Sequence, residues 1–158
     1  MRPPTGPSGS LTREAPRLGR LVWASEGIAA ALGDVLASGA ADDEQVVELA
    51  RRINAHVSAA GVLRARLPEL REFPVASLVR GDGLDRWAAL LEQVRGADPA
   101  MALELEQQGA AVLAAGCRRV VADASPVGSP TVRRHLARLG EQSRGTVDEE
   151  LLTELAGP

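Results

Sequence analysis

Apolar residues recur at intervals of three and four along most of this sequence, the spacing that gathers side chains on one face of an α-helix. The clearest case begins at Asp98-Pro99, an N-cap followed by proline at the first helical position. The predicted core positions of this helix alternate by four and three, as bundle packing requires: Glu106, Ala110, Leu113, Cys117, Val120 and Ala124. A carboxylate, that of Glu106, is therefore expected in line with the core.

Two earlier helices are predicted from the same periodicity. The first runs from near Pro16 to Ser38. The second begins after Asp42, whose side chain is expected to form a capping box with Gln45, and it ends before Pro68. The predicted core stripe of the second helix consists of Val46, Ala50, Ile53, Val57, Ala60, Leu63 and Leu67.

Shorter segments complete the expected architecture. Residues 69–83 read as a crossing segment, 84–94 as a short helix, and Pro130 as the start of a further helix that presents Val132, Leu136 and Leu139. A brief helical turn is expected near the C-terminus, capped by Thr146. We therefore predict an all-α, antiparallel four-helix bundle with a short extra helix over residues 16–158, preceded by a flexible tail at 1–15 that is rich in Pro, Gly and Ser.

Composition narrows the functional classes. The 158 residues are 45% hydrophobic but only 2% aromatic, which favours close packing of aliphatic helices. Net charge is −3 and the acidic residues are interspersed with the arginines, so the electrostatic footprint of a nucleic-acid-binding protein is missing. The single cysteine, Cys117, excludes an intrachain disulfide, and no signal-like or membrane-spanning run is present, which predicts a cytoplasmic protein without a membrane partner.

Two stretches resemble ferritin-like helical bundles of the actinobacterial type: "VLRARLPEL" at 62–70 and "LAAGCRRVVADASPVGSPTVRRHLARLGEQ" at 113–142. In metal-binding members, the resemblance implies carboxylates on the first and third bundle helices and Glu-x-x-His motifs on the second and fourth. Glu26 and Glu106 match the carboxylate positions. The histidine motifs are missing, because the second helix has "SAAGVL" at 58–63 and the last helix places Arg144 three residues after Glu141.

Each ionisable candidate has a structural interpretation that we favour. Glu26 is expected at the edge of the apolar stripe of its helix, paired with an arginine. Glu106 is expected in a buried ion pair or near the open end of the bundle. We expect His56 to be a boundary histidine that hydrogen-bonds to a neighbouring helix, Cys117 to be a small core residue, and His135 to lie on a solvated basic turn. The alternative is an atypical metal site formed by Glu26, His56, Glu106 and Glu141.

The favoured functional hypothesis is a non-catalytic ferritin-like bundle without a cofactor, which binds a protein partner or a small apolar ligand. Homo-oligomerisation is plausible because the helix after Pro99 has a second apolar face through Met101, Leu105 and Val112. Glycines inside helical patterns indicate either close helix approach or space for a ligand. The alternative hypothesis is a di-iron or single-metal carboxylate oxidoreductase. The paired arginines at 51–52, 118–119 and 133–134 are expected on solvated faces.

Overall fold

The computed structural model of the protein describes residues 8–67, 74–123 and 146–157. Over these residues the chain is helical and contains no strand, which confirms the all-α prediction. The elements are α1 (Ser8–Ala37), α2 (Asp43–Arg64), the 3-10 helix η1 (Val75–Leu78), α3 (Asp85–Gly96), α4 (Pro99–Asp123) and α6 (Glu149–Ala156). None of the described helices is long and apolar enough to cross a membrane.

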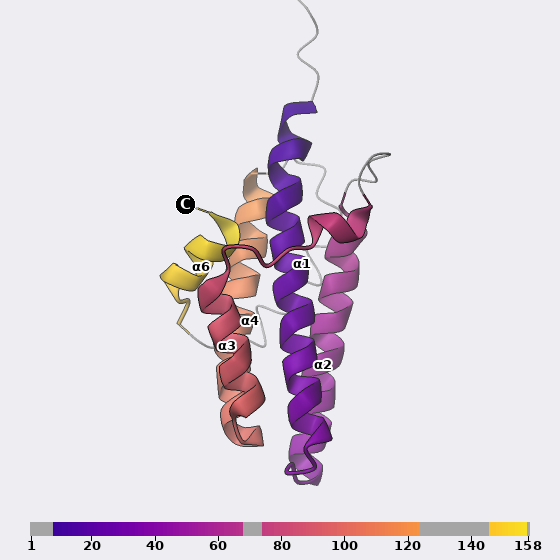
Figure 1. The fold of residues 1–158 in the computed structure, drawn as a ribbon, viewed down its shortest axis with the longest axis vertical. Helices are drawn as coiled ribbons and strands as arrows, with labels where there is room; N and C mark the ends of the chain where they lie inside the picture. Colours follow the sequence, from indigo (N-terminus) through magenta and orange to yellow (C-terminus); the bar gives the residue numbers. More distant parts are fainter. Residues whose placement is uncertain (1–7, 68–73, 124–145, 158) are drawn as a thin grey trace, which may run out of the picture.

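Helix α1 lies at the centre of the arrangement, with α2 on one side and α3 and α4 on the other (Figure 1). Helix α2 returns alongside α1 after a short turn and is antiparallel to it. Helix α4 is also antiparallel to α1, since Gly109 lies next to Ile28 while Gly116, two turns later, lies next to Leu21. Helices α2 and α4 therefore run in the same direction.

The described part of the expected crossing segment, residues 74–83, passes over α1 and leads into α3 (Figure 1). Gly19 of α1 faces the backbone of Leu78, and Gly81 lies against the ring of Trp23. A β-carbon at Gly19 would collide with the Leu78 carbonyl oxygen, and one at Gly81 would collide with the indole. The partly buried Trp23 thus packs against a connecting segment.

Local capping signals are largely as predicted. The Asp42 carboxylate accepts a hydrogen bond from the Gln45 backbone N–H at 2.8 Å, and the Gln45 side chain accepts one from the Asp42 N–H at 3.0 Å. Asp98 accepts from the Met101 N–H at 3.0 Å. The prediction for α6 is wrong, because Asp148 caps that helix instead of Thr146. Asp148 lies directly before the first helical residue, Glu149, where its carboxylate can accept from the free backbone N–H groups.

Helix α3 receives its N-terminal cap from a distant part of the chain. The carboxylate of Glu154 on α6 accepts hydrogen bonds from the backbone N–H groups of Arg86 and Trp87, both at 3.1 Å. The indole N–H of Trp87 donates to the carbonyl of Leu151 at 3.2 Å. Leu84, the residue at the N-cap position, makes no side-chain cap. The C-terminal helix therefore completes the start of α3 as well as covering its buried face.

Helix α1 is longer than the sequence predicts. It begins at Ser8 instead of near Pro16, within the stretch 1–15 that was predicted to be a flexible tail, and residues 1–7 lie outside the described ranges. Proline inside a helix costs one backbone hydrogen bond but does not always end the helix, and Pro16 is accommodated here on an exposed surface. The predicted helix after Pro130 also lies outside the described residues.

The predicted core stripe of α2 is wrong in its N-terminal part and confirmed in its C-terminal part. Val46 and Val57 are 38% and 54% exposed, whereas Ala60, Leu63 and Leu67 are buried as predicted. In the N-terminal part the buried positions include Arg52 and His56, whose polar side chains a search for apolar periodicity counts as outward. On α4 the predicted stripe from Glu106 to Val120 is buried, which confirms its phase, and Ala124 is not described.

Candidate functional site

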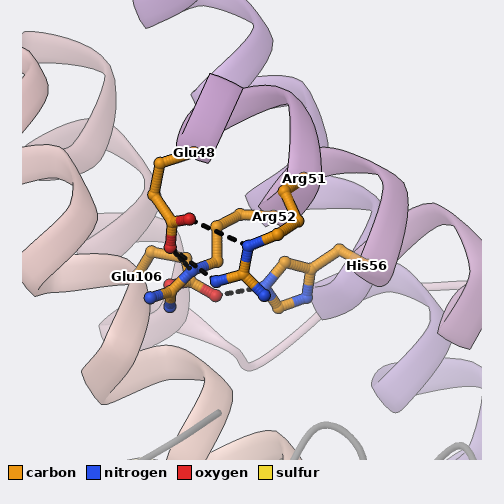
Figure 2. A network of polar contacts seen from close by, with 5 residues as sticks. All are labelled: Glu48, Arg51, Arg52, His56 and Glu106. Carbon is orange, nitrogen blue, oxygen red and sulfur yellow. Dashed lines mark hydrogen bonds and ion pairs between the residues drawn. The ribbon is translucent and has the colours of Figure 1, made fainter. Parts of the chain in front are cut away.

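The polar side chains of the α2 core face meet Glu106 of α4. Glu106 is 2% exposed and His56 is fully buried. The Nε2 atom of His56 lies 2.7 Å from one Glu106 carboxylate oxygen, and Nη1 of Arg52 donates to the other. Figure 2 shows the three side chains converging from the two parallel helices. Both oxygens of the Glu106 carboxylate are thus occupied by donors from α2.

Arg52 links this buried carboxylate to a second one nearer the surface. Its Nε donates to Glu48 at 2.7 Å, while Arg51 donates to both Glu48 oxygens at 2.6 and 2.8 Å. The side chain of Glu48 is 31% exposed and that of Arg51 is 47% exposed. We call Glu48, Arg51, Arg52, His56 and Glu106 the Glu106 cluster (Figure 2). The cluster extends from the exposed Arg51 to the fully buried His56.

The sequence positions Glu48, Arg52 and His56 at successive intervals of four, so α-helical geometry places them on one face of α2. Leu49, Arg52, His56, Ala59 and Leu63 also alternate by three and four, which is a core register occupied in part by polar residues. Arg52 and Glu48 were not predicted as site residues. The core register was the available signal for Arg52, and the spacing of four was the available signal for Glu48. This register could be recognised only by allowing an arginine and a histidine to count as buried.

The cluster is balanced in charge when its histidine is neutral, because two carboxylates face two guanidinium groups. Hydrogen bonds from Arg51 and then Arg52 hold the pKa of Glu48 at about 2, below its ordinary value of 4.5, although burial acts in the opposite direction. An ionised Glu106 can only accept hydrogen bonds, so Nε2 of His56 carries the proton that it shares with Glu106. Within the described structure, Nδ1 of His56 is buried and has no hydrogen-bond partner.

The predicted site residues are only partly brought together. Glu106 lies in the expected buried ion pair, and His56 makes the expected hydrogen bond to a neighbouring helix. His56 is nevertheless a core residue, so its predicted boundary position is wrong. Glu26 is apart from the cluster: its side chain is 43% exposed and pairs with Arg64 of α2, as an arginine-paired boundary residue should.

The remaining metal candidate, Glu141, lies outside the described residues, as does His135. Among the residues that the structure does describe, no group of three or more His, Cys, Asp and Glu side chains is placed to hold a metal ion. Arg52 gives a physical reason for this at the Glu106 cluster. Its guanidinium lies between two carboxylates, keeps its positive charge at all relevant pH values, and would repel a cation from the same place.

Other polar candidates are less buried or less reactive. Cys117 is a core residue as predicted, and burial raises the pKa of its thiol to about 12, which disfavours the nucleophilic thiolate. Arg118 and Arg119 lie on an exposed face, as expected, but the corresponding prediction is wrong for Arg52, which is buried. The arginines at 133–134 are not described.

The helical glycines fall into two groups, those in close contact with another helix and those with no neighbour within 4 Å. A β-carbon at Gly27 would come within 2.6 Å of Leu91, one at Gly109 within 2.9 Å of Ile28, and one at Gly116 within 3.1 Å of a leucine on α1. These three positions permit close helix approach. A β-carbon at Gly33 or Gly61 would meet nothing within 4 Å, so close packing within the described chain does not explain those two glycines.

The pH dependence of stability provides a test of the outer part of the cluster. Because the folded-state pKa of Glu48 is lowered from 4.5 to about 2, its stabilising contribution is present above pH 4.5 and is lost as the pH falls toward 2. We expect Glu48→Gln to lower the free energy of unfolding near neutral pH by up to about 1 kcal/mol, and to flatten its decrease over that acidic range. Urea unfolding at several pH values measures both effects. Glu104→Gln, at an exposed position of α4, is the control, and an equal effect of the two substitutions would contradict the assignment.

No family model, no characterised protein and no solved structure matches this chain. The function therefore has to be inferred from the geometry of the Glu106 cluster and from the helix surfaces.

Proposed function

We propose that the protein is a non-catalytic helical bundle that acts by binding, and that its preferred ligand is a protein partner. In this proposal the bundle is of the four-helix, ferritin-like type and acts in the cytoplasm. Helices α1, α2 and α4 form three of its sides. The antiparallel relation of α1 to both α2 and α4 supports this arrangement.

The observation that carries the non-catalytic proposal is the position of Arg52 between Glu48 and Glu106. A carboxylate that acts as a metal ligand or a proton acceptor needs an oxygen lone pair that is open to the reactant. Both oxygens of Glu106 instead accept hydrogen bonds from Arg52 and His56, and both oxygens of Glu48 accept from arginines. The ionic groups therefore serve to join α2 to α4 in the interior.

A second candidate function, a metal-dependent carboxylate oxidoreductase with iron as its metal, is favoured by one feature. His56 and Glu106 bring an imidazole and a carboxylate from two helices into contact, and these are ligand types that iron accepts. A cation would bind there only if Arg52 moved away. The unpartnered Nδ1 of His56 similarly supports a variant of the binding proposal in which a small hydrogen-bonding ligand occupies the interior.

Metal analysis together with measurement of the assembly state tests these functions. We expect protein purified from iron-supplemented cells to contain no stoichiometric metal, and we expect native mass spectrometry or light scattering to detect a bound partner or copy. Stoichiometric iron that is lost in Glu106→Gln, with helicity retained by circular dichroism, would establish the oxidoreductase instead. A strict monomer that copurifies with neither protein nor small molecule would contradict both forms of the binding proposal.

A further inference from the structure

The outward face of α2 carries a stripe opposite its buried face. Its members are all exposed and recur at intervals of three and four: Val47, Ala50, Asn54, Val57 and Gly61. Val47 is 68% exposed and Val57 is 54% exposed, which makes them the two most exposed large apolar residues of the described chain. We call these five residues the outer stripe. Such spacing is that of a helix seam which packs against another helix.

The shape and polarity of the outer stripe favour a close helix partner. A β-carbon added at Gly61 would meet no atom within 4 Å, so this position leaves room for a side chain from outside. Ala50 is also small, and Val47 and Val57 provide rigid apolar side chains on either side of Asn54. Asn54 stands at the middle of the stripe, and a single asparagine in such a seam selects one register of pairing at some cost in stability.

The charges on α2 indicate the orientation of that partner. Exposed acidic residues, Asp43 and Glu44, lie in the first turn, whereas basic residues, Arg64 and Arg66, lie at the end of the helix or just beyond it. A second α2 in antiparallel orientation would place the acidic end of each helix beside the basic end of the other. A parallel orientation would place like charges together.

We propose that the outer stripe is the docking surface for a second copy of this chain, with the two α2 helices antiparallel about a two-fold axis at Asn54. This inference rests on the proposed binding function and names its partner. Residues at equal distances from Asn54 then face each other across the axis. Val47 meets the space beside Gly61 of the second copy. The acidic first turn of each α2 meets the basic end of the other, where Arg66 is exposed and Arg64 is paired with Glu26 of its own chain.

The assembly state over a concentration series tests the surface. The monomer mass is 16.5 kDa, and light scattering is expected to show a reversible transition to twice that mass. Val47→Asp combined with Val57→Asp should raise the dissociation constant about tenfold or more, since each substitution places a charge in the apolar seam. Met101→Asp is the matched control, because Met101 is an exposed apolar residue of α4 that lies outside the outer stripe.

Cross-linking tests the position of the axis. Asn54→Cys should form a disulfide-linked dimer readily, whereas Gln93→Cys, at an exposed position of α3, should not; the native Cys117 is buried. A dimer that the valine substitutions leave unchanged would overturn the outer stripe as the interface and leave the binding function standing. A chain that stays monomeric at all concentrations would overturn the proposal that the partner is a second copy. The binding function would be overturned as well only if no other molecule copurifies with the monomer. Circular dichroism of each variant establishes that it remains folded.

Discussion

Glu106→Ala is expected to lower the free energy of unfolding by about 3 to 5 kcal/mol, because it breaks a buried ion pair. It leaves Arg52 with the partly exposed Glu48 as its counter-charge and leaves Nε2 of His56 without its acceptor. The carboxylate is 2% exposed, and the groups that it satisfies, on Arg52 and His56, have little access to water. Urea unfolding followed by circular dichroism gives the change. A loss below about 1 kcal/mol would mean that water reaches the carboxylate site and that the pair is not desolvated.

A matched control and a compensating variant separate lost charge from lost packing. Glu48→Ala removes a carboxylate from the same cluster at a position with access to solvent, and it should cost about 1 kcal/mol or less. Replacing Arg52, His56 and Glu106 together by Met, Leu and Leu removes every buried charge at once and should recover most of the stability lost in Glu106→Ala. Failure of the triple variant to recover stability would assign the loss to packing.

Trp87→Ala is expected to lower the free energy of unfolding by about 3 to 5 kcal/mol, since it empties the space of a fully buried indole between α3 and its neighbours. The same change removes the hydrogen bond to Leu151 and therefore weakens the docking of α6. Trp87→Phe keeps most of the volume and should cost about 1 to 2 kcal/mol, mainly through the unsatisfied carbonyl. Chemical unfolding of both variants measures the two contributions.

The C-terminal helix offers a second test of this junction. Glu154→Ala leaves two backbone N–H groups at the start of α3 without their carboxylate acceptor, while the indole stays in place. The variant should lie between wild type and Trp87→Ala in stability, with a loss of about 1 kcal/mol, as expected for an N-cap. If Trp87→Ala proves no worse than Glu154→Ala, the indole is not the anchor of α6 that its burial indicates.

Local features explain why much of the helical pattern was predictable. Asp42 with Gln45, and Asp98 with Pro99, determine helix starts through bonds within a few residues, so their effect does not depend on the rest of the chain. The stripe of α4 was predictable because nearly all of its buried positions are apolar. Thr146 was wrongly predicted as the cap of α6 because more than one polar residue lies before that helix, and only their geometry selected Asp148.

The candidate site was predictable only in part. Glu106 was expected in a buried ion pair from its place on an apolar stripe, and that expectation holds. Its partner was not foreseen, because Arg52 was assigned to a solvated face and the valines of α2 favoured the wrong phase. A residue that is buried with a counter-ion gives the same sequence signal as one that is exposed, since both interrupt apolar periodicity.

The sequence by itself determined which segments are helical and where several of them begin, because those properties depend on spacing and capping within a few residues. Only the tertiary structure decided that Arg52 and His56 face inward and that Glu106 accepts hydrogen bonds from both. It also decided that Glu154 caps a helix far from it in the chain. Burial of a charged side chain is stable only when its partner is in place. That partner is supplied by another helix, so Glu106 of α4 allows Arg52 and His56 of α2 to face inward.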